Sequence, residues 1–186
     1  MIKIMPFLLL INTFVLGQDV PAKDISIADE LKKYTRAVWR GAGGDNLNYC
    51  YRGPDKLAPG KKYPLLFYLH GSGGRGNDNK GQLLDANGLE AFAEQEIFTK
   101  HSSYVFAGQV PKGERWVDVA WNALEHSMPP VSNSMGLALE ALDAFVANKE
   151  HQVDPNRIYV MGLSMGGYGT WDAIQRRPQY FAAAVP

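Results

Sequence analysis

The stretch Gly162-Leu163-Ser164-Met165-Gly166-Gly167 decides the fold, because of what stands on either side of it. Residues 158–161 form a short apolar run that is typical of a buried strand. Residues 168–175 have the pattern of a helix, which we expect to end before Pro178 because proline cannot continue a helix. The sequence therefore predicts a strand, a sharp turn and a helix, in that order.

Ser164 is the candidate reactive residue of this turn. It stands at the centre of a G-x-S-x-G pattern, in which the turn is too tight for side chains at Gly162 and Gly166. Such a turn lifts the serine oxygen clear of the sheet, and the first amides of the following helix point toward the same place. We therefore predict that Ser164 is a nucleophile. The alternative is a glycine-rich turn whose serine has no chemical role.

A second motif follows another apolar run. Residues 63–69 are continuously apolar, as expected of a central parallel strand, and they lead directly into His70-Gly71-Ser72-Gly73-Gly74-Arg75-Gly76. One interpretation is half of an oxyanion hole, in which a backbone N–H near Gly71 or Ser72 faces the nucleophile. A second is the G-x-G-x-x-G pattern of dinucleotide-binding folds, and a third is a plain glycine-rich turn.

The dinucleotide interpretation fits its surroundings poorly. Residues 77–81 are polar and do not open a helix, and the strand at residues 104–107 is followed by no acidic residue for a ribose. We therefore expect no nucleotide cofactor. His70, at the start of the loop, is expected to brace it through hydrogen bonds to the backbone rather than to act as a general base.

The remaining chain alternates predicted strands and helices, which favours a mostly parallel sheet. Strands are predicted at residues 47–52 and 102–110, and helices at residues 28–40, 83–100 and 135–146. Arg115 and Trp116 follow the 102–110 strand at its carboxyl end, where such sheets bind ligands. They are candidate substrate-binding residues. The alternative is a surface loop that tucks the tryptophan into the core.

The amino terminus and the composition restrict the function. Residues 1–17 have a basic start, an apolar run and a small-residue end, which together indicate a cleavable signal peptide and a secreted or periplasmic protein. The apolar run is too short to predict a stable membrane span. Nineteen basic and 19 acidic residues leave no net charge, which disfavours nucleic acid as a partner. The single cysteine, Cys50, is expected to be a small buried side chain, with pairing to a missing partner cysteine as the alternative.

The motifs together resemble a known family. The chain is similar to secreted α/β-hydrolases of the esterase, polyhydroxybutyrate-depolymerase-like and predicted-peptidase (prolyl-oligopeptidase-like) group. The resemblance rests on the residues at 63–71, 76–78, 111–116, 153–160 and 162–167. It implies an α/β-hydrolase fold with helices on both faces of the sheet and a nucleophile at Ser164. It also implies oxyanion donors at Met165 and at Ser72 or Gly71, with no metal and no cofactor.

One feature departs from that family. In this fold the catalytic acid and histidine follow the serine, whereas His70, His101, His126 and His151 all precede Ser164. The chain ends at residues 181–186, which are expected to begin another buried strand. We therefore expect a fragment that is truncated after the nucleophile helix: a signal peptide at 1–17, an extension at 18–46 and an incomplete hydrolase domain at 47–186.

Three functions follow from this sequence. The first is hydrolysis of a small-molecule or polymeric carboxylic ester through an acyl-enzyme, with the fragment itself expected to be inactive. The second is peptide hydrolysis by the same machinery. The third is a hydrolase-fold protein that binds without catalysis, which is favoured if the whole protein has no histidine after its last strand.

Overall fold

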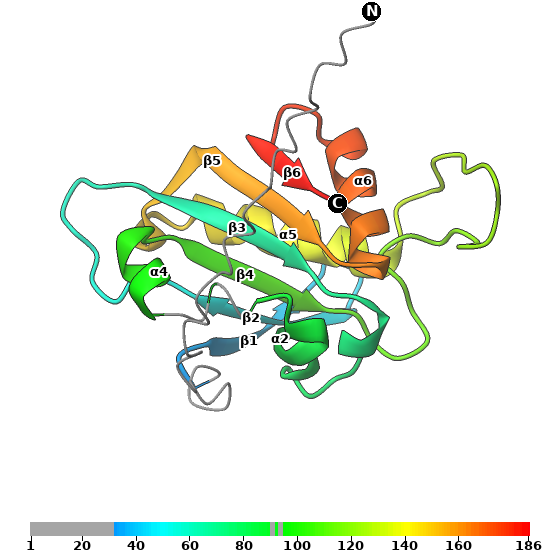
Figure 1. Cartoon of the computed structure of the whole chain (residues 1–186), viewed down its shortest axis with the longest axis horizontal. Coiled ribbons are helices and arrows are strands. Elements are labelled where there is room, and N and C mark those ends of the chain that lie inside the picture. The colour runs from blue at the N-terminus through cyan, green and yellow to red at the C-terminus, as the bar shows by residue number, and fades with distance from the viewer. Residues whose placement is uncertain (1–31, 90–91, 93–94) are drawn as a thin grey trace, which may run out of the picture.

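The structure is a computed structural model that describes residues 32–89, 92 and 95–186. Within this part of the chain, six strands form one sheet in the order β1-β2-β4-β3-β5-β6 (Figure 1). The strands β3, β4, β5 and β6 run parallel to one another, and β2 is antiparallel to both β1 and β4. Their bounds are β1 Thr35–Arg40, β2 Asn46–Arg52, β3 Tyr63–Leu69, β4 Tyr104–Gln109, β5 Val153–Gly162 and β6 Ala183–Val185.

Helices cover both faces of this sheet, as predicted. The larger helices, α5 (Asn133–Ala147) and α6 (Met165–Arg176), pack on the face formed by Leu65, Phe67 and Leu69 of β3 (Figure 1). The shorter helices α2 (Gly81–Leu84) and α4 (Gln95–Lys100) pack on the other face, with Tyr68 and Leu66. The short 3₁₀ helices are η1 Ser72–Gly74, η2 Asp85–Asn87 and η3 Lys149–His151. Successive side chains of β3 point to opposite faces of the sheet, so this one strand contributes to the hydrophobic core on both faces.

Most of the predicted elements are confirmed. The apolar runs at 63–69 and 102–110 become β3 and β4, the run before Ser164 becomes β5, and the apolar stripe at 135–146 lies in α5. The Ser132 hydroxyl caps that helix by accepting a hydrogen bond from the Met135 amide at 3.1 Å. The residues of the stripe that are buried against the sheet are Met135, Ala138, Leu139, Leu142 and Phe145.

The predicted helix at residues 28–40 is wrong over its described part. Residues 35–40 form strand β1, which pairs with β2 from Thr35 opposite Tyr51 to Arg40 opposite Asn46. Val38, in the middle of this strand, is 53% exposed. Pairing with an available sheet edge outweighs a weak helical pattern here. The sheet therefore extends into the predicted amino-terminal extension.

The predicted helix at residues 83–100 is also wrong as a single element. The structure has α2, η2 and α4 in this region, and Ala86 has a left-handed backbone with φ of 48°. That conformation interrupts a right-handed helix. The segment at the end of the chain does form a strand, but β6 lies at the sheet edge with Ala183 and Val185 exposed, so the expected burial is not observed.

Two further predictions concern the cysteine and the amino terminus. Cys50 is fully buried and free, and burial raises the pKa of its thiol to about 12, which confirms a small core side chain.

The predicted signal peptide at residues 1–17 lies outside the described residues. None of the helices in the described ranges has the length and hydropathy that crossing a bilayer requires.

Candidate active site

The turn at Ser164 has a strained backbone. Ser164 has φ of 53° and ψ of −112°, a conformation that residues with a side chain rarely adopt, and it is the residue that precedes the first turn of α6. Its side chain is exposed. The Gly166 amide donates to Leu163 O at 2.7 Å and the Gly167 amide to Ser164 O at 2.8 Å, which fixes the turn. The predicted strand-to-helix turn is therefore confirmed.

The flanking glycines are required by close packing. A Cβ added at Gly162 would overlap the carbonyl group of Gly166, and one added at Gly166 would overlap Leu69 O at the end of β3. Real Cβ atoms do not approach backbone atoms so closely, so the backbone itself would have to move. Glycine is therefore required two residues before and two residues after Ser164 because there is no space for a side chain at either position.

The Ser164 turn and the glycine-rich loop (residues 70–76) lie side by side. Strands β3 and β5 are parallel neighbours with Leu69 opposite Gly162, so both loops leave the same edge of the sheet. The Leu163 amide donates to Leu69 O at 3.2 Å, and a Cβ at Gly71 would lie 3.3 Å from Leu163 O. The sheet therefore brings together two motifs that are far apart in the sequence.

The amide of Met165, at the start of α6, and the amide of Ser72, at the start of η1 in the neighbouring loop, donate to no backbone carbonyl among the described residues. The Met165 side chain is buried, whereas Ser72 is exposed. A pair of free amides at the start of a helix and in a glycine-rich loop can hold a negatively charged oxygen.

His70 braces the glycine-rich loop, as predicted. Its Nε2 accepts a hydrogen bond from the Val110 amide at 3.0 Å, so the ring proton lies on Nδ1, which donates to Gly71 O at 2.6 Å. The side chain is fully buried, and this desolvation lowers its pKa to about 4. Both ring nitrogens are occupied, so His70 has no lone pair available for the Ser164 proton.

Trp116 lies beneath the loop rather than on its surface. It is fully buried, its Nε1 donates to His70 O at 3.0 Å, and its ring packs edge-on against His70 with centroids 5.3 Å apart. The prediction that Trp116 lines a substrate groove is therefore wrong for its side chain, because a buried indole with a satisfied N–H supports the loop from inside. Arg115 remains at the surface, and its Nη1 donates to Val119 O at 2.7 Å.

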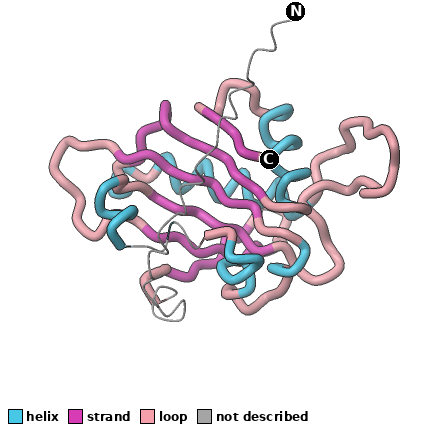
Figure 2. The backbone as a smooth tube through the Cα atoms, in the orientation of Figure 1, coloured by secondary structure: helices cyan, strands magenta, loops and turns pink. Residues whose placement is uncertain are grey.

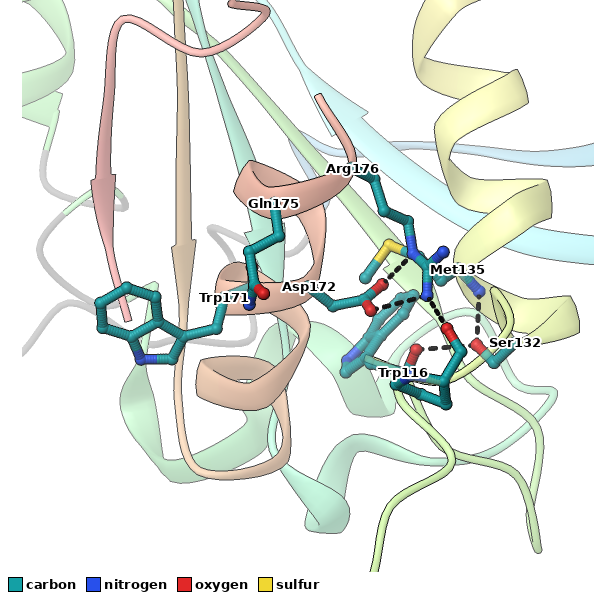
Figure 3. A network of polar contacts seen from close by, with 8 residues as sticks. Trp116, Ser132, Met135, Trp171, Asp172, Gln175 and Arg176 are labelled. Carbon is teal, nitrogen blue, oxygen red and sulfur yellow. Dashed lines mark hydrogen bonds and ion pairs between the residues drawn. The ribbon is translucent and has the colours of Figure 1, made fainter. Parts of the chain in front are cut away.

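Other candidate acid and base residues form interactions that do not include the Ser164 side chain. The Asp172 carboxylate forms a two-bond ion pair with Arg176, at 2.7 and 2.8 Å (Figure 3). His151 stacks on Phe145 beside the amino end of β5, with its Nδ1 2.9 Å from Phe145 O. His126 contacts the Tyr168 ring at 5.6 Å between centroids. In residues 32–89 and 95–186, no histidine is hydrogen bonded to Ser164.

A long loop (residues 117–131) folds against α6 beside the Ser164 turn. Arg176 Nη2 donates to Pro129 O at 2.7 Å (Figure 3). Tyr168 Oη donates to Trp121 O at 3.2 Å. Figure 2 shows this loop in pink, projecting from the molecule at the right. A cavity of about 240 Å³ lies between loop and helix, lined by Val119, His126, Met128, Tyr168 and Trp171 among others.

The sequence alone did not identify Trp121 of the long loop, or its neighbours Tyr168 and Arg75, as residues beside the Ser164 turn. Trp121 stacks on Tyr168 with ring centroids 6.5 Å apart, and the guanidinium of Arg75 lies over the same indole. Tyr168 stands one helical turn after Ser164, which was the one available signal that it faces the site. Within the described residues, no cluster of three His, Cys, Asp or Glu side chains has an arrangement suited to a metal ion.

Comparisons with known proteins agree with this architecture. Residues 132–186 match the Prolyl oligopeptidase family. The chain is 28% identical to a poly(3-hydroxybutyrate) depolymerase of Ralstonia pickettii over 127 residues, which is 67% of this chain and 25% of that protein. It is 26% identical to a probable dipeptidyl-aminopeptidase B of Metarhizium robertsii over 158 residues, which is 80% of this chain and 16% of that protein.

A solved structure gives the strongest support for the fold. The crystal structure of a thermostable esterase superposes with a TM-score of 0.75 at 32% identity, covering 84% of this chain and 41% of the esterase. The chain thus spans less than half of the esterase and at most a quarter of the two curated relatives. The sheet order, the helices on both faces and these matches show that the chain has an α/β-hydrolase fold and is similar to the esterase- and peptidase-like group of that fold.

Proposed function

We propose that this protein is a serine hydrolase that cleaves carboxylic esters, with Ser164 as the nucleophile. The observation that carries the proposal is the exposed, strained backbone of Ser164 beside the free amides of Met165 and Ser72. Strained backbone at an exposed polar residue is a feature of reactive sites. The similarity to a protein described as an esterase and to another described as a depolymerase supports an ester as the substrate.

The proposed mechanism has two steps. Ser164 Oγ attacks the ester carbonyl carbon, and the carbonyl oxygen becomes an oxyanion that accepts hydrogen bonds from the Met165 and Ser72 amides. The C–O bond to the leaving group then breaks, the base passes the proton it took from Ser164 to the departing alkoxide, and an acyl group remains on Ser164. Water attacks this acyl-enzyme and releases the acid, while Ser164 recovers its proton. Gly71 allows the loop backbone to approach the substrate closely.

The mechanism needs a base for the Ser164 proton. A serine hydroxyl is a weak nucleophile unless a base removes its proton, and the described residues hold no histidine in contact with Ser164. We therefore expect this chain alone to turn over esters negligibly. A longer form of the protein that supplies a histidine at Ser164 is expected to be active.

The test is hydrolysis of 4-nitrophenyl butyrate together with labelling by a fluorophosphonate probe. Labelling that disappears in Ser164→Ala supports the assignment, with Ser127→Ala, a serine of the long loop, as the matched control. Brisk turnover by residues 18–186 alone would show that an upstream histidine acts as base. Absence of both labelling and turnover in the longer form would overturn the proposal in favour of a non-catalytic binding protein.

A serine peptidase is the second candidate. The match to the Prolyl oligopeptidase family over residues 132–186 favours it, and the same nucleophile and amides would serve an amide substrate. Comparing 4-nitrophenyl esters with aminoacyl 4-nitroanilides separates the two, because an esterase leaves the anilides unchanged.

We also propose that the protein is exported after removal of residues 1–17. The basic start, the apolar run and the small residues before Gln18 support cleavage. Amino-terminal sequencing of the protein from culture medium or periplasm tests this, and recovery of Met1 there would contradict it.

A further inference from the structure

Two arginine side chains each lie close to the indole ring of Trp121. The Cζ atom of Arg115 lies 4.7 Å from the centroid of Trp121, and the Cζ atom of Arg75 lies 5.6 Å from it. Trp121 belongs to the long loop and is 40% exposed, so this cluster opens to solvent. A guanidinium over an aromatic face is attracted to the ring, but two like charges on one ring repel each other.

This cluster adjoins the Ser164 turn on two sides. Arg75 Nη2 lies 3.2 Å from the sulfur of Met165, the residue that follows Ser164. Tyr168, whose ring stacks on Trp121, donates its amide to Ser164 O at 3.3 Å. Arg75 therefore contacts the residue that follows the proposed nucleophile, and Arg115 is linked to the same turn through Trp121 and Tyr168.

Arg75 has too few acceptors for its donors. Its Nε is buried without a hydrogen-bond partner, and the contact to the Met165 sulfur is with a weak acceptor. Other arginines of the described chain, Arg157, Arg176 and Arg177, each pair with a carboxylate. Within the described residues, neither Arg75 nor Arg115 has a carboxylate oxygen within 4.0 Å. The amino terminus of α6 adds positive potential to the same place.

We propose that Arg75 and Arg115 form, on the platform of Trp121, a subsite for a carboxylate carried by the substrate. This inference rests on the proposed function, because it places the anion beside an ester that Ser164 attacks. The substrate class is then an ester whose acyl portion bears a free carboxylate, such as a half-ester of a dicarboxylic acid. Planar guanidinium groups match a carboxylate with paired, charge-assisted hydrogen bonds.

The experiment compares two esters of similar size in a form of the protein that turns over 4-nitrophenyl butyrate. Mono-4-nitrophenyl glutarate carries a carboxylate, and 4-nitrophenyl butyrate does not. Wild type is expected to prefer the glutarate in kcat/KM. Arg75→Met and Arg115→Met are each expected to lower kcat/KM for the glutarate about tenfold or more, with less than about a threefold change for the butyrate. Arg75→Lys keeps the charge and is expected to restore part of the preference.

Lys112→Met is the matched control, since it removes one charge from an exposed neighbouring turn and should leave the ratio of the two esters unchanged. Equal losses for both esters in the arginine variants, or no preference in wild type, would overturn the subsite. A binding measurement separates its failure from that of the proposed function. Ser164→Ala should still bind monomethyl glutarate by calorimetry, and Arg75→Met introduced into it should weaken that binding about tenfold.

Discussion

Gly166 and Leu69 lie in contact through their backbones, with no room between them for a side chain. A Cβ built on Gly166 would overlap Leu69 O and lie 3.0 Å from His70 O. The first turn of α6 is therefore seated directly on the end of β3. The position of Ser164 relative to the glycine-rich loop is set by this contact between two rigid elements rather than by flexible side chains.

Gly166→Ala should therefore destabilise the protein severely. The added methyl group meets backbone atoms, which cannot rotate away, so we expect a loss of about 3 kcal/mol or more in the free energy of unfolding, or no folded protein. Urea unfolding followed by circular dichroism measures it. Gly43→Ala, in the turn between β1 and β2, has nothing within 4 Å and should change stability by less than about 0.5 kcal/mol. Equal effects of the two substitutions would contradict the contact.

Ser164→Gly should be more stable than Ser164→Ala. Both remove the hydroxyl, but only glycine relieves the backbone at φ of 53° and ψ of −112°. After subtracting the greater flexibility that glycine gives the unfolded chain, we expect a difference of about 1 kcal/mol in favour of glycine. Thermal and urea unfolding of the two variants give the comparison. A less stable glycine variant would mean that the turn stores no strain.

The pH dependence of stability should contain a component from His70. The pKa of His70 is lowered from 6.5 to about 4 in the folded protein, so the unfolded chain binds more protons between these values. The contribution to stability is therefore complete above about pH 6.5 and is lost as the pH falls toward 4. We expect it to be on the order of 3 kcal/mol.

Urea unfolding at several pH values between 4 and 7.5 tests this component. His70→Gln should flatten the dependence in that range, whereas His101→Gln, which removes an exposed histidine, should leave it as in wild type. An unchanged slope in His70→Gln would show that this histidine is not held in its neutral form by the fold.

The ion pair between Arg176 and Asp172 should hold the long loop in place. The Asp172 side chain is 3% exposed, and the Arg176 guanidinium also donates a hydrogen bond to Pro129 O. Arg176→Met leaves a buried carboxylate without a partner, so we expect about 3 kcal/mol of destabilisation and faster proteolysis within residues 117–131. Arg157→Met breaks an ion pair whose arginine is 45% exposed, and should cost less than about 1 kcal/mol. Matching losses, or unchanged proteolysis, would argue against this anchoring role.

The sequence predicts the central part of this fold well because buried strands and the Ser164 turn leave strong local signals. The apolar runs at 63–69 and 158–161 have few alternatives once they are bounded by glycine-rich segments. The edge strand β1 left no such signal. Whether residues 35–40 become strand or helix depends on pairing with β2, which local periodicity does not encode.

The surroundings of Ser164 were only partly predictable for a related reason. His70 could be assigned to loop bracing because it stands at a strand end, and its contacts with Val110 and Gly71 agree. The burial of Trp116 and the approach of Trp121 to Arg75 depend on how two loops fold over α6. Such contacts between irregular segments arise from tertiary packing and have no fixed spacing in the sequence.

The placement of β3 beside β5 also determines when the site can form as the chain folds. The glycine-rich loop follows β3, but its neighbour β5 arrives only after β4, the long loop and α5 have been made. The entropic cost of closing this separation precedes the contacts that offset it, so non-local pairings of this kind form slowly. During synthesis, the strained conformation of Ser164 is therefore absent until the crossover through α5 has docked. Reactivity at Ser164 should then appear abruptly, in the same step that completes the centre of the sheet.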